Sequence, residues 1–270
     1  MVETATGVHR IDGINGSNAV LLADEQMAVI DTGIRGNGDA IVAYIKKIGR
    51  SPSDLRWILV THFHFDHSGS AAELSDLTGA RVVAHEAETE PGPDGTLLLR
   101  KGNEGQRPPF LYRLVTGRGW GRPRDVEYHD TMVHETVADD EVLPCLGGIR
   151  VIHTPGHTPG SICPLVEGPG VLFLGDSVLN NVTRLSRPLT WDHSKRRQLD
   201  TSLHSLRGLD AHVACFGHGP PITEDVMTSV RGLTDRPYDL PTWRIAWKNR
   251  ATLKRWKANT RQPGHWEGGR

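Results

Sequence analysis

The sequence has few cysteines, no long apolar run and little excess charge of either sign. Its three cysteines are scattered and odd in number, so they predict no disulfide framework and favour a reducing compartment. No apolar stretch is long enough to cross a bilayer, and the N-terminus lacks the basic start and apolar core of a secretory signal. We therefore expect a cytoplasmic protein that does not enter a membrane.

Charge and composition also limit the classes of partner. The net charge is −1, which by itself predicts nothing about partners. We do not expect nucleic acid as a partner. Only 37% of the residues are hydrophobic, and the 30 glycines and 17 prolines predict many loops. At 270 residues the chain can form one large domain with a sizeable core. The composition fits an enzyme for a small-molecule substrate and predicts nothing about oligomeric state.

The most informative segment is the run Thr61-His62-Phe63-His64-Phe65-Asp66-His67, which contains three imidazoles and one carboxylate. These are side chains that bind borderline divalent ions such as zinc. A single histidine is most often a surface residue or a satisfied core residue. That explanation is poor for three histidines so close together, so the run predicts a metal site.

The flanking sequence places this run on a loop between a strand and a helix. Residues 56–60 are apolar after Arg56 and end in the β-branched Val60, which predicts a buried strand, and residues 68–77 predict a helix. Such strand ends are where α/β proteins gather their chemistry. His62 and His64 are two residues apart, so in an extended turn they point the same way. The carboxylate and the last histidine of the run can face a second position nearby, which favours two ions side by side.

Three later segments repeat one pattern, in which an apolar strand and a glycine precede a side chain that can bind a metal. These side chains are His157, Asp176 and His218. Glycine at such a position lets the backbone turn sharply and approach a bound ion. A helix N-cap is the alternative role for Asp176. Asp31, which precedes Thr-Gly, is expected to form a turn and to support the site through hydrogen bonds.

Together these features resemble the metallo-β-lactamase superfamily of hydrolases. The resemblance covers about residues 20–220 and includes the strand and turn at residues 27–33, the histidine run and the three later segments. It implies an α/β (α+β) fold, a four-layer αββα sandwich with the metal site along one edge. It also implies two ligand sets and one bridging residue: His62, His64 and His157 for a first metal, Asp66, His67 and His218 for a second, and Asp176 between them.

The chemistry expected of such a centre is hydrolysis. We expect two Zn²⁺ ions per chain, with iron or manganese as alternatives, roughly 3.5–4 Å apart. Zinc lowers the pKa of its bound water from about 15.7 to about 7, so a metal-bound hydroxide can attack the substrate at neutral pH. Two residues are assigned catalytic roles. Asp66 could relay a proton to the leaving group, and His193 lies in a loop after Asp176 from which it could reach the substrate.

The sequence defines the substrate less well. Superfamily members that cleave β-lactams lack the bridging aspartate, so Asp176 disfavours antibiotic hydrolysis. The acyl-homoserine lactonases and the glyoxalase II thioesterases share the loop at residues 154–160. The lactonases carry a tyrosine where Leu179 stands here, and the thioesterases carry Gly-Cys-Gly-Arg where this chain has residues 180–184. The resemblance therefore implies cleavage of an ester, thioester or lactone. The alternatives are a phosphodiesterase or nuclease of the same fold and an iron-dependent sulfur dioxygenase.

The chain is expected to form one domain over residues 1–225, with two additions. An insertion at residues 86–140 carries, between residues 100 and 124, seven basic residues and one acid with aromatic residues interleaved. We expect this insertion to be a lid that attracts an anionic substrate, the alternative being a solvated surface extension. Residues 226–270 are expected to form a basic, helical C-terminal extension packed on the domain.

Overall fold

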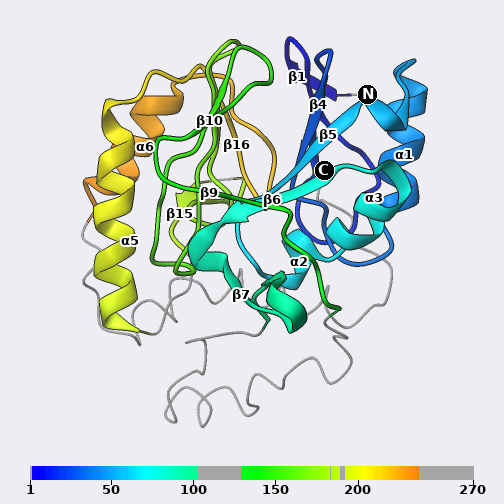
Figure 1. Cartoon of the computed structure of the whole chain (residues 1–270). Helices are drawn as coiled ribbons and strands as arrows, with labels where there is room; N and C mark the ends of the chain where they lie inside the picture. The colour runs from blue at the N-terminus through cyan, green and yellow to red at the C-terminus, as the bar shows by residue number, and fades with distance from the viewer. Residues whose placement is uncertain (1, 102–128, 183, 189–191, 237–270) are drawn as a thin grey trace, which may run out of the picture.

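Two β-sheets pack face to face between two layers of helices (Figure 1). Helices α1 and α3 cover the outer face of one sheet, and α5 and α6 cover the outer face of the other, which confirms the four-layer αββα sandwich. The computed structural model describes four stretches of the chain: residues 2–101, 129–182, 184–188 and 192–236. Most of the predicted basic lid and most of the predicted tail lie outside the described residues, so both stay predictions.

The first sheet has seven strands in the order β1-β2-β3-β4-β5-β6-β9. Strands β1 to β4 pair antiparallel, whereas β4, β5, β6 and β9 run parallel, so their carboxyl ends lie at one edge. Strands β3 and β4 form an antiparallel hairpin. In chain order the strands span Val2–Ala5, Val8–Arg10, Val20–Leu22, Met27–Ile30, Leu55–Val60, Arg81–His85 and Glu135–Val137.

The second sheet has five strands in the order β10-β11-β12-β13-β16, with β13 and β16 parallel and the other pairs antiparallel. These strands span Val142–Leu143, Ile149–Arg150, Leu165–Val166, Val171–Phe173 and Val213–Cys215. Two hairpins lie outside both sheets: β7 (Thr89–Pro91) with β8 (Leu97–Leu99), and β14 (Leu179–Asn180) with β15 (Leu185–Ser186). The described part of the predicted insertion therefore supplies β7, β8 and β9.

The α-helices of the described residues are α1 (Gly38–Lys47), α2 (Phe65–Ser68), α3 (Ala71–Thr78), α5 (His193–Ser205) and α6 (Val226–Thr234). The same part of the chain contains four short 3-10 helices, which span Pro52–Asp54, Glu86–Glu88, Pro93–Gly95 and Leu206–Gly208. The helix predicted for residues 68–77 is present as α3, and the separate single turn α2 precedes it. Within the described residues, no helix combines the length and the apolar character needed to span a bilayer.

The described residues form three hydrophobic cores between the four layers. Alternation along the strands separates them, because successive side chains of a strand point to opposite faces. In β4, Ile30 packs in the core between the two sheets, and Val29 packs in the core under α1 and α3. The third core joins the second sheet to α5 and α6 and includes Leu199 and Val230.

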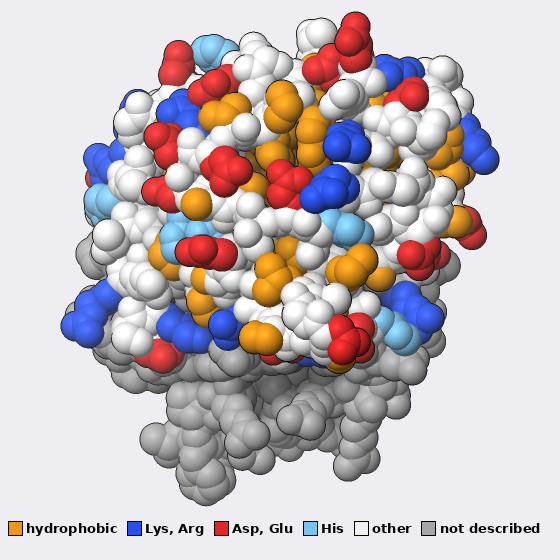
Figure 2. All heavy atoms as spheres, in the orientation of Figure 1, with side chains coloured by type: hydrophobic (Ala, Val, Ile, Leu, Met, Phe, Trp, Pro, Cys, Tyr) orange, Lys and Arg blue, Asp and Glu red, His pale blue; other side chains and the backbone are white. Residues whose placement is uncertain are grey.

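The face seen in Figure 1 carries acidic and basic side chains interspersed with apolar ones (Figure 2). Among the described residues of that face, neither sign forms a continuous stripe.

The functional side chains follow the carboxyl ends of strands. Asp31 follows β4 and His62 closely follows β5 in the first sheet, whereas Asp176 follows β13 and His218 follows β16 in the second. The strands of each pair run parallel, so each sheet presents two of these residues at the same edge. The packing of the two sheets then brings the four residues together.

Candidate metal centre

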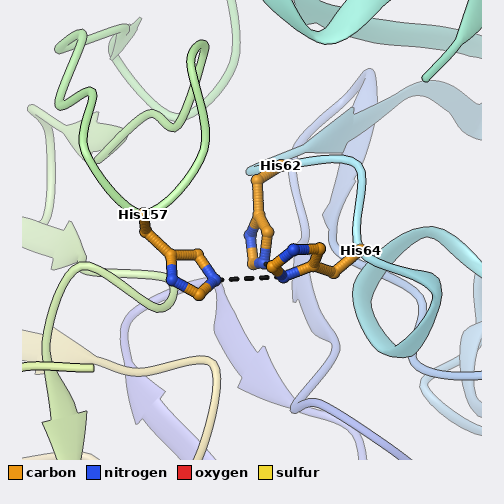
Figure 3. Close-up of side chains that lie close together, drawn as sticks. All are labelled: His62, His64 and His157. Atoms are coloured by element: carbon orange, nitrogen blue, oxygen red, sulfur yellow. Dashed lines mark hydrogen bonds between the residues drawn. The ribbon is translucent and has the colours of Figure 1, made fainter. Parts of the chain in front are cut away.

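Three buried histidines from two loops form a cluster that we call the first triad: His62, His64 and His157 (Figure 3). The first two lie in the loop after β5, and the third lies in the loop between β11 and β12. His64 Nδ1 lies 3.0 Å from His62 Nε2 and 3.0 Å from His157 Nε2. A single proton at His64 Nδ1 can form a good hydrogen bond to only one of these two nitrogens, whereas one cation could bind all three nitrogens.

Thr61 sets the orientation of His62. The Thr61 hydroxyl donates to Asp31 Oδ2 at 2.7 Å, so its oxygen is left to accept from His62 Nδ1, which is 3.1 Å away. A proton on Nδ1 leaves the lone pair on His62 Nε2, the nitrogen that lies in the first triad. The loop therefore presents His62 in the tautomer that binds a metal.

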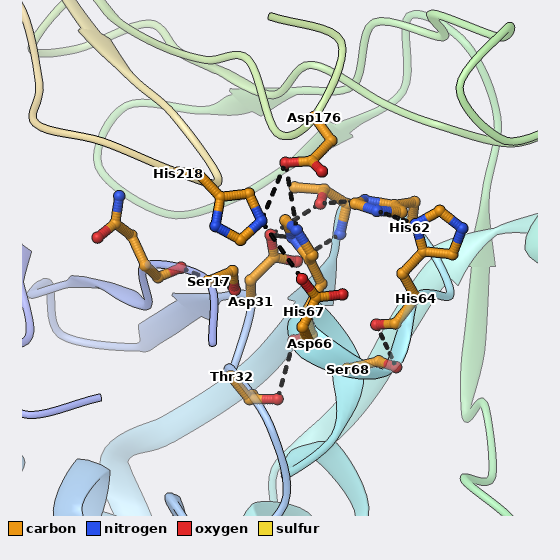
Figure 4. Close-up of polar contacts among 12 residues, drawn as sticks. Ser17, Asp31, Thr32, His62, His64, Asp66, His67, Ser68, Asp176 and His218 are labelled. Carbon is orange, nitrogen blue, oxygen red and sulfur yellow. Dashed lines mark hydrogen bonds and ion pairs between the residues drawn. The ribbon is translucent and has the colours of Figure 1, made fainter. Parts of the chain in front are cut away.

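Asp66, His67 and His218 form a second cluster, the second triad (Figure 4). Asp66 and His67 lie in α2, and His218 lies in the loop after β16. Asp66 Oδ2 is 3.3 Å from His218 Nε2. The side chains of Asp66 and His218 are 24% and 20% exposed, whereas that of His67 is fully buried. The centre is therefore open to solvent on the side of Asp66 and His218.

The Asp176 carboxylate lies between the two triads. Its Oδ1 is 3.3 Å from His67 Nε2 and 3.6 Å from His218 Nε2, and its Oδ2 is 3.7 Å from His157 Nε2. One oxygen therefore faces each triad, as a bridging ligand requires. The chain after Asp176 forms a turn and then β14 instead of a helix, so the alternative N-cap role is wrong.

Asp31 supports the centre without belonging to either triad. Its Oδ2 contacts His67 Nδ1 at 2.7 Å, and its Oδ1 accepts a hydrogen bond from the Thr61 backbone N–H at 2.8 Å. The bond to Nδ1 leaves His67 Nε2 facing Asp176. Asp31 has a φ of 55°, in the left-handed region that aspartate tolerates better than most residues. The supporting role predicted for Asp31 is confirmed.

The loop that carries His218 is fixed by Asn18 and by a glycine. Asn18 Nδ2 donates to two backbone carbonyls of this loop, at 2.9 and 2.8 Å. A β-carbon on Gly217 would lie 2.5 Å from both Asp176 Oδ1 and His67 Cε1. Only glycine therefore lets the loop approach the other residues of the centre so closely.

The surroundings keep the first triad neutral. Burial, followed by repulsion from the neighbouring imidazoles, lowers the pKa of His62 well below its usual value and lowers the pKa of His64 to about 3. Burial also lowers the pKa of His157. Neutral imidazole is the form that binds a metal, so the first triad is ready to do so at neutral pH.

The second triad has a different electrostatic balance. Burial alone would lower the pKa of His67 and His218, but the Asp176 carboxylate, assisted by Asp31 at His67 and by Asp66 at His218, raises both. Burial also opposes the ionisation of Asp66 and Asp176, but their interactions with the two imidazoles are stronger and lower both carboxyl pKa values. The second triad therefore places ionised carboxylates beside imidazoles.

Buried polar atoms of the centre fit a bound cation. His67 Nε2 and Asp176 Oδ1 face each other, yet neither has a hydrogen-bond partner of acceptable geometry among the described residues. Leaving buried polar atoms in that state costs free energy, and a cation between them would remove the cost. The side chains of the centre also form groups of three whose ligand atoms lie within 4.8 Å of one another. Imidazole and carboxylate are the donors that zinc accepts.

The structure brings together all seven residues that the resemblance implies as ligands. His193 is the first residue of α5, but its side chain is outside the described part of the chain, so its contact with substrate stays a prediction. The sequence does not predict that Asn18 contacts the loop of His218 or that the buried Glu88 contacts the loops of the first triad. A single asparagine or glutamate carries no spacing signal that relates it to the histidine loops.

Known proteins resemble this chain over the same region. The sequence model of the metallo-beta-lactamase superfamily matches residues 12–218, which include Asp31 and the seven predicted ligands. An N-acyl homoserine lactonase from a Bacillus species is 29% identical over 143 residues, which cover 52% of this chain and 45% of that enzyme. The chain therefore matches less than half the length of this relative. The probable metallo-hydrolase YqgX of Bacillus subtilis is 28% identical over 212 residues, covering 77% of this chain and 86% of YqgX.

Solved structures of metallo-beta-lactamase family proteins have a similar fold. A metallo-beta-lactamase family protein from Thermus thermophilus, TTHA1429, is 24% identical and superposes with a TM-score of 0.59. The superposition covers 95% of this chain and 83% of the other. At this identity the likeness concerns the fold alone.

Proposed function

This chain belongs to the metallo-β-lactamase superfamily, and from that premise we propose that it is a hydrolase with a dinuclear zinc centre that cleaves an ester, thioester or lactone. The observation that carries the proposal is the position of Asp176, whose two oxygens face different triads. A carboxylate in that position can bind two cations at once. A mononuclear site would leave one complete set of ligands without a role.

The ligand assignment follows from the two triads. The first cation is assigned to the first triad, the second cation to the second triad, and Asp176 to both. The neutral imidazoles of the first triad suit zinc, and the carboxylates beside the second triad also suit manganese or iron. Zinc is the simplest single metal that fits both positions.

The protein's own contribution is to position and orient the ligands. Thr61 holds His62, and Asp31 holds His67, each with its free ring nitrogen turned toward the centre. When bound there, divalent cations lower the pKa of a coordinated water to about 7 and polarise the carbonyl under attack, as ester and lactone cleavage requires. The chain therefore needs no serine or cysteine nucleophile at the centre.

Substrate approaches from the open side of the centre, where Asp66 and His218 are partly exposed. We assign Asp66 a second role there, the transfer of a proton to the leaving group. The lowered pKa of Asp66, which results from its contacts with His218 and His67 against the effect of burial, makes it a weak base, so its main role is that of ligand. His193, at the start of α5, is assigned to substrate contact.

A lactone is the first substrate to test, because an N-acyl homoserine lactonase is among the relatives. Leu179 stands where those lactonases carry a tyrosine, so thioesters and open-chain esters belong in the same panel. A β-lactam serves as the negative control, because a bridging aspartate is not a feature of the β-lactam-cleaving members. The charge of the predicted lid favours anionic substrates within each class.

Elemental analysis of the purified protein, combined with this substrate panel, tests the proposal. We expect about two zinc ions per chain and turnover of at least one ester, thioester or lactone. One iron per chain with oxygen uptake would contradict the proposal in favour of a sulfur dioxygenase. Turnover of phosphodiesters alone would contradict it in favour of a phosphodiesterase or nuclease.

A further inference from the structure

A buried carboxylate next to the centre belongs to neither triad. Glu88 is the last residue of the 3-10 helix Glu86–Glu88, which follows β6, and it is 0% exposed. Buried carboxylates are rare unless they are paired or fully hydrogen-bonded. The partners of Glu88 therefore indicate its role.

Both oxygens of Glu88 accept hydrogen bonds. Oε2 accepts from the backbone N–H of Phe63 at 2.6 Å. Oε1 accepts from the Thr158 hydroxyl at 2.8 Å and from the backbone N–H of Gly160 at 2.5 Å. A backbone N–H can only donate, so these contacts suit the ionised carboxylate, which is an acceptor at both oxygens.

These bonds join the two loops that carry the first triad. Phe63 lies between His62 and His64 in the sequence, and Thr158 directly follows His157. One carboxylate oxygen is bonded to the first loop and the other to the second. Because the two oxygens belong to one carboxylate, the fixed distance between them sets the distance between the two loops.

The contact between Glu88 and the loop of His157 is close. A β-carbon on Gly160 would lie 2.8 Å from Glu88 Cγ and 2.9 Å from its backbone N. Glycine at this position is therefore what permits the approach. Thr158 Oγ1 also lies 2.6 Å from Ser161 Oγ, so the same loop is fixed internally as well.

The second triad has its own supports. Asp31 bonds to His67, and Asn18 bonds to the loop of His218. The side-chain hydrogen bonds of Glu88 described above reach only the loops of the first triad. Asp31 also reaches His62 of the first triad, but only through Thr61. Glu88 is therefore the group that joins the two loops of the first triad directly.

We propose that Glu88 is a positioning residue that fixes the spacing of the two loops of the first triad and so sets the affinity of the first cation, but not of the second. This inference rests on the proposed dinuclear centre. Residues that orient metal ligands typically change metal affinity by about 10–100-fold when they are replaced.

Glutamine is the sharpest probe, because it keeps the size of the side chain but has one oxygen and one NH₂ group. Whichever way the amide sits, one of the two loops meets a donor in place of an acceptor. We expect Glu88→Gln to weaken binding of the first cation by about 10–100-fold. Binding of the second cation should be unchanged.

Two ligand variants assign the effect to one triad. His218→Ala leaves the first triad complete, and His157→Ala leaves the second triad complete. Zinc affinity is measured in each background by competition with a chromophoric chelator. Glu88→Gln should weaken zinc binding about 10–100-fold in the His218→Ala background and leave it unchanged in the His157→Ala background. An equal loss in both backgrounds, or no loss in the first, overturns the proposal.

Glu86→Gln is the matched control, because Glu86 is exposed and lies in the same 3-10 helix, and it should leave both affinities unchanged. Circular dichroism checks the fold of each variant. If Glu88→Gln does not fold, zinc affinity is measured for Glu88→Asp instead. Aspartate keeps the charge but is one methylene too short to reach both loops. The aspartate variant should show the same selective loss, and an unaltered zinc affinity overturns the proposal.

The same measurements separate this inference from the proposed function. Wild-type protein that binds no metal overturns the proposed function, and the inference falls with it. Wild-type protein that binds two zinc ions, together with a Glu88→Gln variant of unchanged affinity, overturns the inference alone.

Discussion

The two triads meet at Asp176 but differ in charge and in support. The first consists of three imidazoles that burial keeps neutral, on two loops joined by Glu88. The second combines the Asp66 carboxylate with two imidazoles, of which His67 is held by Asp31. Imidazole alone suits zinc and similar ions, whereas carboxylate also accepts harder ions such as manganese. Two neighbouring cation positions in one centre therefore need not be equivalent, and we expect the first to be the more selective.

Loss of Asp176 should have the largest effect, because it removes the group that the two triads share. We expect Asp176→Ala to reduce turnover to the uncatalysed background, and His62→Ala to do the same by breaking the first triad. Steady-state rates and metal content are the measurements. Asp210→Ala, at an exposed position, is the control and should keep full activity. Full activity in either ligand variant, with the fold intact by circular dichroism, contradicts the ligand assignment.

Removal of the metals should show that the two triads bind their cations with different affinities. Titration with a chelator should release the two cations in two steps, since the triads differ in ligands and in support. A cation present at about a thousand times its Kd stabilises the native state by about 4 kcal/mol. Removal of each cation should therefore lower Tm by about 8–16 °C for a domain of this size. Release in a single step would show that the triads are equivalent, and an unchanged Tm would show that neither binds a metal tightly.

Asp31→Asn is the counterpart of Glu88→Gln in the second triad. The asparagine cannot offer His67 a carboxylate, so we expect the second cation to bind about 10–100-fold more weakly. The first cation should change less, because Asp31 reaches His62 only through Thr61. Metal content and chelator competition measure both effects, with the exposed Asp39→Asn as control. If Asp31→Asn weakens binding of the first cation more than binding of the second, Asp31 does not mainly support the second triad, and the prediction is wrong.

Asn18→Ala should have the smallest effect of these changes. It removes two hydrogen bonds to the loop of His218, and we expect a loss of about 1–3 kcal/mol in the free energy of unfolding. Urea unfolding with and without zinc measures it, and the zinc-loaded protein should lose more than the metal-free protein. Asn181→Ala removes a hydrogen bond to Ser186 and is the matched control, for which the loss should not depend on zinc. An equal loss for Asn18→Ala with and without zinc would show that Asn18 does not support the second triad.

The strands and the clustering of the seven predicted ligands could be anticipated from local signals and from the resemblance to a family. The alternation along β4 separates two cores, and His62, Asp176 and His218 closely follow apolar strands, so neighbouring residues carry the information. Element ends were less predictable. The sequence predicts one helix over residues 68–77, whereas the structure has the single turn α2 followed by α3. The pattern of residues 68–77 does not predict α2, because most of this turn lies within the histidine run.

The contacts of Glu88 and Asn18 could not be predicted because their partners are remote in the sequence. Glu88 lies 25 positions from Phe63 and 70 from Thr158, and Asn18 lies 198 positions from Phe216. No period or motif relates such positions, so only the packed fold reveals the contacts. The cytoplasmic location, the anionic substrate and the lid stay predictions, since they depend on charge and composition alone.

Anomalous diffraction at the zinc edge, from crystals of the zinc-loaded protein, tests the central claim most directly. We expect two peaks roughly 3.5–4 Å apart, one at each triad, with one Asp176 oxygen bound to each. A single peak, or two peaks that leave Asp176 unbound, would contradict that claim.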